Sequence, residues 1–375
     1  MTEFRPELLD DPAGLAEADR GGLLRALATA GAQVRRAVAT AEEFGVGRLR
    51  GEVPPRAVLV APDAHAPYLS SLLAALAAGA APVLDWRDPV LPRWAGPADA
   101  LLVASADGRH PRLAELVAQA ARRGLAVAVA APAGSPVAAA AARYPVADLS
   151  HLAGVPSRAI WWSLATPALL ALDALGLAGP GALLPELADR LDEVAELDRP
   201  DSDAFVGPGK VLAAELAESV PVIAGAGSVA TVAARRVAGA VQLLGGSTAM
   251  AASLPDDVAR IGSLLEFAAV EGDFFADRIE EAVVKPRLVL IGDDEQYGRP
   301  AETDQLGEQA GRRAAAALSG LARSRGIGVS RVQVPEAPPL VRFAAATAAG
   351  DFAASYLALA RGIDPSAPRL GELDH

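Results

Sequence analysis

The chain has 375 residues, of which 52% are hydrophobic, and this length and composition favour two buried cores over one. It contains no cysteine, which excludes disulfides, thiolate nucleophiles and cysteine metal ligands. Its formal net charge of −12 would repel nucleic-acid phosphates, so we expect no nucleic-acid partner.

The beginning of the chain, MTEFRPELLDDPAG, is acidic and lacks the apolar core of a signal peptide, so we expect a cytoplasmic protein. One stretch, 159–178, is about as long as a bilayer-spanning helix. It contains Pro167 and Asp173, and we expect no second apolar span with which Asp173 could pair. We interpret this stretch as a buried helix and expect no membrane partner.

The first predicted elements are a helical pattern over about 12–45 and then apolar strands that alternate with helices. The strands are expected at 57–61, 82–86, 101–105 and 125–131, with helices at about 66–78 and between Gly108 and Gly124. Alternation of this kind is typical of a mostly parallel sheet covered by helices on both faces.

A long apolar helix after Pro156 and a charged helix near 185–197 lead into RPDSDAFVGPGK, which we predict to be a linker. A second alternating series follows, with strands at 220–227, 287–294 and 328–334 and helices at 229–241, about 302–325 and about 339–361. Ligands of open parallel sheets lie beyond the carboxyl ends of the strands. We therefore expect sites in the loops after Val60, Val103, Ile223 and Ile291.

The loop after the strand at 101–105 carries Ser105, Asp107, Gly108 and Arg109. A hydroxyl, a glycine, helix-start amides and a guanidinium could together hold a phosphate. Asp107 brings negative charge to the same place, however, and a serine or aspartate before a helix is often only a cap. Both interpretations stay open at this point.

A second glycine-rich turn, with Gly225, Gly227 and Ser228, follows a strand and opens a helix, as phosphate-binding turns do. It departs from GxGxxG at Ala230, and no acidic residue follows at the expected place, so a dinucleotide is a minor alternative. Ser228 could also be a simple N-cap.

Metal and cofactor sites are not expected. The four histidines, His65, His110, His151 and His375, fall singly, without a second ligand at zinc spacing. The acids of GDDE at 292–295 could bind magnesium, but without a P-loop a solvated turn is the default interpretation.

The segment GDFAASYLALARGIDPSAPRLGELDH, from Gly350 onward, resembles the closing segment of the bacterial and archaeal bifunctional phosphoglucose/phosphomannose isomerases. Three further stretches resemble the same family: PVLDWRDPVLPRWAGPADALLVAS, GVPSRAIWWSLATPAL and PVIAGAGSVATVAARR. The resemblance implies an α/β protein with two sugar isomerase (SIS) domains, each a flavodoxin-like parallel sheet flanked by helices, that works as a homodimer. The domains implied are a helical extension (1–52), a first SIS domain (53–156), connecting helices (157–205) and a second SIS domain (206–375).

The residues that the family uses for chemistry are mostly replaced. The GxGGSA phosphate loop falls on 61–66, where Pro62 has no N–H to donate and Asp63 would repel a phosphate. The SYSGNT loop falls on ASADGR, 104–109, which keeps one hydroxyl. The arginine expected to steady the developing enediolate matches Arg158.

The three proton-handling groups are missing at the matched positions. The catalytic glutamate falls near Gly245, the ring-opening histidine falls within 253–266, which has none, and the terminal lysine falls on Asp374. Each such group typically contributes a factor of about 10² to 10⁴ in rate.

Three functions remain open. The first is a SIS-type protein that binds a sugar phosphate or a related small molecule with weak or no isomerase activity. The second is an active phosphosugar isomerase with a substitute base among Asp256, Asp257 and Glu266, assisted by His65 or His110. The third is a structural subunit that associates with an enzyme of sugar-nucleotide synthesis.

Overall fold

A computed structural model describes residues 3–144, 146–149, 154–268, 285–292, 305–332 and 337–367. The chain divides into two compact units. The first unit is residues 28–192, and the second unit combines residues 1–27 with 193–375. The predicted domain limits at 52, 156 and 205 stay a prediction, since these units only group the segments by compactness.

The first unit contains a five-stranded parallel sheet in the order β2-β1-β3-β4-β5. This is the strand order of flavodoxin-like folds, so the predicted fold class is confirmed for this unit. Its strands are β1 (Val58–Pro62), β2 (Val83–Asp85), β3 (Ala100–Ala104), β4 (Ala126–Ala130) and β5 (Ala147–Asp148).

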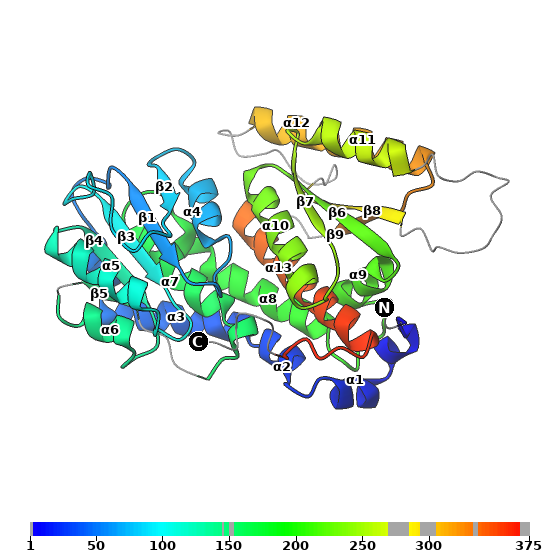
Figure 1. Cartoon of the computed structure of the whole chain (residues 1–375), viewed down its shortest axis with the longest axis horizontal. Helices are drawn as coiled ribbons and strands as arrows, with labels where there is room; N and C mark the ends of the chain where they lie inside the picture. Colours follow the sequence, from blue (N-terminus) through cyan, green and yellow to red (C-terminus); the bar gives the residue numbers. More distant parts are fainter. Residues whose placement is uncertain are drawn as a thin grey trace. The chain divides into compact units, whose positions relative to one another are not determined.

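Helices cover both faces of this sheet (Figure 1). One face packs against α5 (Pro111–Arg122) and α6 (Pro136–Ala141). The other face packs against α4 (Leu69–Ala77) and α7 (Trp161–Ala174), and α3 (Ala30–Phe44) lies against α7. The central strands β1 and β3 are buried at every residue, as expected for strands covered on both faces.

The second unit contains a four-stranded parallel sheet in the order β7-β6-β8-β9. Its strands are β6 (Ser219–Ala226), β7 (Met250–Leu254), β8 (Lys285–Ile291) and β9 (Val329–Val332). In chain order the strands that the structure describes here follow the first four of the flavodoxin-like order. Two sheets of one plan in one chain confirm the predicted double α/β architecture.

The sheet of the second unit also lies between two helical layers (Figure 1). The helices α11 (Val258–Ala268) and α12 (Gln305–Ser324) pack on one face, around a core that includes Val222, Leu254 and Leu288. The other layer consists of α9 (Pro208–Leu216), α10 (Ser228–Leu243) and α13 (Pro339–Ala360).

The beginning of the chain joins the second unit. The elements here are a 3-10 helix η1 (Pro6–Asp10), α1 (Pro12–Ala18) and α2 (Leu23–Leu27). The backbone N–H of Arg5 donates to the carbonyl of Ala360 at 3.0 Å, and α2 packs on α13. The remaining elements are η2 (Val46–Leu49), η3 (Ser157–Ala159), η4 (Pro180–Leu183) and α8 (Leu184–Leu197).

Within the described ranges, α13 is the helix that is long and apolar enough to cross a membrane, and all of its most apolar window is buried inside the protein. A core helix of a soluble protein passes the same test, so this is weak evidence for a membrane span. The sequence analysis considered a different stretch, 159–178; most of it is α7, which is buried within the first unit.

Candidate functional site

In each unit there are two neighbouring strands after which the chain runs toward opposite edges of the sheet. In the first unit this switch point lies between the carboxyl ends of β1 and β3, and in the second between those of β6 and β8. Ligands of flavodoxin-like folds bind in such crevices. The predicted loop at Ser105–Arg109 follows β3, and the predicted turn at Gly225–Ser228 spans the end of β6 and the start of α10, so both lie at switch points.

The loop after β3 is held by the chain's own oxygens. The buried Ser105 hydroxyl donates to Oδ2 of Asp63 at 3.0 Å, and the backbone N–H of Ala106 donates to the same oxygen at 2.6 Å. The N–H of Gly108 donates to Oγ of Ser105 at 3.1 Å, and that of Arg109 donates to Oδ1 of Asp107 at 2.9 Å. These groups, which could cradle a phosphate, therefore already have partners.

Asp63 lies in the loop after β1, the other loop of this switch point. Its Oδ1 accepts the backbone N–H of His65 at 2.8 Å and lies 3.4 Å from Nδ1 of the same residue. Burial favours a raised pKa of Asp63, but the hydrogen bonds from the His65 side chain and from the N–H groups of Ala106 and His65 outweigh it and lower the pKa. Asp63 is thus a carboxylate at neutral pH, and it joins the two loops of the switch point.

Two arginines fix the same edge of the sheet. Arg112, on α5, donates from Nη1 to the carbonyl of Trp86 at 3.0 Å and from Nη2 to that of Pro62 at 3.1 Å. Arg87 donates from Nη1 to the Pro62 carbonyl at 3.3 Å and pairs with Asp85. Burial, followed by the charge of Arg87, lowers the pKa of Arg112. The sequence analysis did not identify these arginines, which tie the ends of β1 and β2 to α5.

Gly108 is required by the packing of its loop. Its φ is +65°, and a Cβ at this position would lie 2.1 Å from Oγ of Ser135, which caps α6 by accepting the N–H of Ala138. The side chain of Arg109 is exposed. His110 caps α5, because its Nδ1 accepts the N–H of Arg112 at 3.3 Å, and this gives it a structural role.

Arg158 lies in the same unit on η3, directly before α7. The start of α7 is anchored near the β1 loop, since the indole N–H of Trp161 donates to the carbonyl of Pro67 at 3.1 Å. The segment that carries Arg158 is therefore linked to the loop that follows β1. The predicted role of Arg158 as a substrate contact stays a prediction.

The turn after β6 is built differently. Gly225 packs so closely on the start of α10 that a Cβ would lie 2.2 Å from the carbonyl oxygen of Ala230. Gly227 has φ +100° and occupies the N-cap position, with no side chain capping the helix, and Ser228 is the exposed first residue of α10. Ser228 is therefore not the N-cap, one of the alternatives considered from the sequence. The positive end of a helix macrodipole lies at this turn.

The substitute bases lie near β7 and on α11. Oδ2 of Asp257 accepts the N–H of Ser253 at 2.8 Å, and Oδ1 pairs with Arg260. The bond from Ser253 is the main cause that lowers the pKa of Asp257, and a lowered pKa makes a weak base. Asp256 and Glu266 are exposed.

Gly245, where the family glutamate falls, follows the C-terminal end of α10, and its N–H donates to the carbonyl of Ala240. It is at the opposite end of the helix from Ser228. The positions of His151, 293–295, Asp374 and His375 lie outside the described residues. Among the residues that the structure describes, no group of three or more histidines and carboxylates could hold a metal ion.

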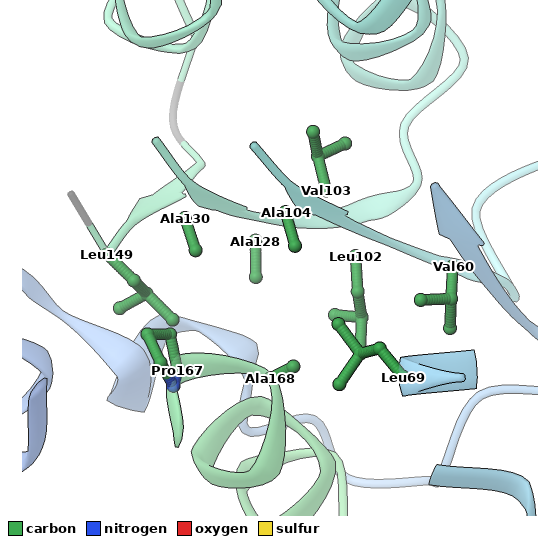
Figure 2. A pocket seen from close by; sticks show the side chains of 10 residues that line it. All are labelled: Val60, Leu69, Leu102, Val103, Ala104, Ala128, Ala130, Leu149, Pro167 and Ala168. Atoms are coloured by element: carbon green, nitrogen blue, oxygen red, sulfur yellow. The ribbon is translucent and has the colours of Figure 1, made fainter. Parts of the chain in front are cut away.

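A small cavity in the first unit is too apolar and too small for a sugar. Figure 2 shows aliphatic side chains from the sheet and from α4 and α7 pointing into it. Its volume is about 10 Å³, the space needed by the centre of one water molecule, and no charged side chain lines it. The lining residues are Val60, Leu69, Leu102, Val103, Ala104, Ala128, Ala130, Leu149, Pro167 and Ala168. We interpret it as a packing gap.

Comparison with known protein families gives a match within the second unit. Residues 205–369 match the family of the bacterial phospho-glucose isomerase C-terminal SIS domain. Among curated proteins, none matches the sequence significantly.

Solved structures support the fold over nearly the whole chain. A glucose-6-phosphate isomerase like protein from Thermus thermophilus is 20% identical, with 95% of this chain and 94% of that chain covered and a TM-score of 0.52. Tagatose-6-phosphate ketose/aldose isomerase from Escherichia coli is 13% identical, with 96% of each chain covered and a TM-score of 0.52. The C-terminal domain of glucosamine-fructose-6-phosphate aminotransferase from Francisella tularensis is 9% identical, with 90% and 96% covered and a TM-score of 0.54.

At these identities the structures establish the fold alone, and the family match comes from the sequence of the second unit. Together they confirm the resemblance first noted in the segment after Gly350. Residues 205–369 are therefore similar to the C-terminal SIS domain of bacterial phospho-glucose isomerases, and the chain as a whole shares the fold of the solved phosphosugar isomerase structures.

Proposed function

We propose that this protein binds a sugar phosphate and has weak or no aldose–ketose isomerase activity. The observation that carries the proposal is the β6–α10 turn, which keeps the glycines and the exposed helix start of a phosphate-binding turn within a SIS domain. The matched positions near Gly245 and within 253–266 provide neither the glutamate nor the histidine of the family.

In this proposal the phosphate lies on the N-terminal amides of α10, beside Gly225, Gly227 and Ser228. The loop at Ser105, Gly108 and Arg109 is the weaker of the two predicted sites, because its amides are engaged by Asp63, Ser105 and Asp107. No cofactor is required. A cytoplasmic homodimer is proposed with it, as the resemblance implies.

The phosphate position is tested with Ser228→Asp and its neutral match Ser228→Asn. A carboxylate at the exposed start of α10 is compatible with the helix dipole but repels a phosphate at the same amides. Glucose 6-phosphate, mannose 6-phosphate and fructose 6-phosphate are added to each protein, and the melting temperature is recorded. At a ligand concentration of about 100 Kd, binding adds about 2.7 kcal/mol to the free energy of unfolding.

We expect at least one sugar phosphate to raise the melting temperature of the wild type and of Ser228→Asn, and not of Ser228→Asp. Equal shifts in all three proteins would place the ligand elsewhere. No shift with any sugar phosphate would reject binding and leave the structural-subunit interpretation, which predicts stoichiometric co-purification with an enzyme of sugar-nucleotide synthesis.

The second candidate is an active isomerase. It is favoured by the position of Asp256 and Asp257 directly after β7, at the same sheet edge as Gly227. It is disfavoured because both carboxylate oxygens of Asp257 are already engaged, one by the N–H of Ser253 and the other by Arg260. The two candidates are separated by a turnover assay on the same sugar phosphates.

A further inference from the structure

The Asp63 carboxylate in the first unit is surrounded in the way that proteins surround a bound anion. Its Oδ2 accepts a hydroxyl from Ser105 and an N–H from Ala106, and its Oδ1 accepts an N–H from His65. The imidazole of His65 lies beside Oδ1. These donors come from the loops after β1 and after β3, so the carboxylate lies at the switch point of the sheet.

These donors need an anion or another acceptor. Ser105 is completely buried and Asp63 is 9% exposed, so water cannot freely replace the carboxylate. Buried N–H and O–H groups that lose their acceptor are costly to the fold, whichever acceptor they lose. The acceptor at this position is the side chain of Asp63, and an external group with acceptor oxygens of similar size could take its place.

We propose that Asp63 is an intramolecular ligand that fills the anion position of the first unit and excludes an external phosphate from it. The proposal refines the proposed function, in which the phosphate binds to the second unit, by explaining why the first unit does not compete for it. It predicts that removal of this one side chain creates a phosphate site from groups that are already in place.

The test uses Asp63→Gly in the full chain with Ser228→Asp, which repels phosphate from the β6–α10 turn. The control is Asp63→Glu in the same background, which keeps a carboxylate near the crevice. Inorganic phosphate is the probe, and binding is measured by calorimetric titration and by the melting temperature, with sodium chloride at matched ionic strength. We expect Asp63→Gly to bind phosphate at least about tenfold more tightly than Asp63→Glu or the Ser228→Asp parent.

A folded Asp63→Gly protein that binds phosphate no better than these controls would overturn the proposal, as would equal binding by Asp63→Glu. Should Asp63→Gly be unfolded in chloride, phosphate or formate is expected to restore its far-UV circular dichroism, because either supplies the missing acceptor. Failure of both to restore it also overturns the proposal. Binding of sugar phosphates to the wild type is measured separately, so failure of the proposed function is recognised on its own.

Discussion

Asp198, at the end of α8, is a buried carboxyl group in the second unit. Its Oδ1 accepts the N–H groups of Gly209 at 2.8 Å and Lys210 at 3.3 Å, at the start of α9. Its Oδ2 has no hydrogen-bond partner among the described residues. Burial raises the pKa of Asp198 to about 7, against the smaller opposing effects of those N–H groups and of the Lys210 charge.

This raised pKa predicts a pH-dependent stability. An aspartate titrates at about 3.9 in an unfolded chain, so between that pH and about 7 the folded state binds the proton more tightly. The contribution of Asp198 is therefore complete below pH 4 and is lost as the pH rises through 7. Relative to wild type, Asp198→Asn should gain up to about 2.7 kcal/mol in the free energy of unfolding between pH 5 and pH 8, because about two units of the shift lie within that range. Urea denaturation at both pH values measures this gain, and an equal difference at both would show that Asp198 does not titrate in this range.

At the same scale, the sequence placed Ser105 and Asp63 in loops of the expected site but did not predict that they are hydrogen-bonded to each other. The charge of Asp63 was predicted to repel a phosphate from the loop at 61–66. The hydrogen bonds that Asp63 accepts from the other loop were not predicted. The structure shows it as the acceptor of the site's donors, including Ser105, 42 positions away in the chain. A single sequence carries no signal for a pair so far apart. The arginines Arg87 and Arg112 were missed for the same reason.

At the scale of elements, α10 and α13 are joined by a buried ion pair. Nη2 of Arg236 and Oδ2 of Asp351 are 2.5 Å apart, and both side chains are about one-tenth exposed. Burial raises the pKa of Asp351, and the Arg236 charge opposes this. A buried pair is a weak net stabiliser, but either partner alone is strongly unfavourable.

We therefore expect Asp351→Ala to lower the free energy of unfolding by about 3–5 kcal/mol, because it removes the carboxylate that pairs with the buried Arg236 guanidinium. The double variant Arg236→Met with Asp351→Leu should recover most of this loss. The matched surface change, Asp189→Ala at the exposed pair with Arg35, should cost less than about 1 kcal/mol. Chemical denaturation measures all of them. A double variant no more stable than Asp351→Ala would argue against the ion-pair explanation.

Hydrophobic periodicity predicted most strands and the long helices. It did not predict α9 and β7. The segment around Pro208 and Gly209 was predicted to be a linker, but α9 begins there. A Cβ on Gly209 would lie 2.7 Å from Cβ of Phe352, so this glycine permits the packing of α9 on α13. The strand β7 was missed because MAASL alternates weakly, and only pairing with β6 identifies it.

For the whole molecule, the two units share one strand order but differ at the switch point. In the first unit a side chain, Asp63, accepts the hydrogen bonds of the switch-point loops, and in the second unit the first residue of α10, Ser228, is exposed. The two sheets therefore provide two equivalent positions, and we propose that only one of them is available for a phosphorylated ligand. Composition and strand order could predict the two switch points, but not that a side chain of the protein accepts the hydrogen bonds at the first of them.

The proposed loss of isomerisation is tested most directly by ¹H NMR of glucose 6-phosphate and mannose 6-phosphate incubated with the pure protein in D₂O. Isomerisation through an enediolate removes the C2 proton, so the spectrum reports both product formation and exchange with solvent. We predict that neither fructose 6-phosphate nor loss of the C2 proton is detected under conditions in which a sugar phosphate raises the melting temperature. Rapid formation of fructose 6-phosphate that is abolished by Asp256→Asn, Asp257→Asn or Glu266→Gln would contradict this prediction and identify an active isomerase.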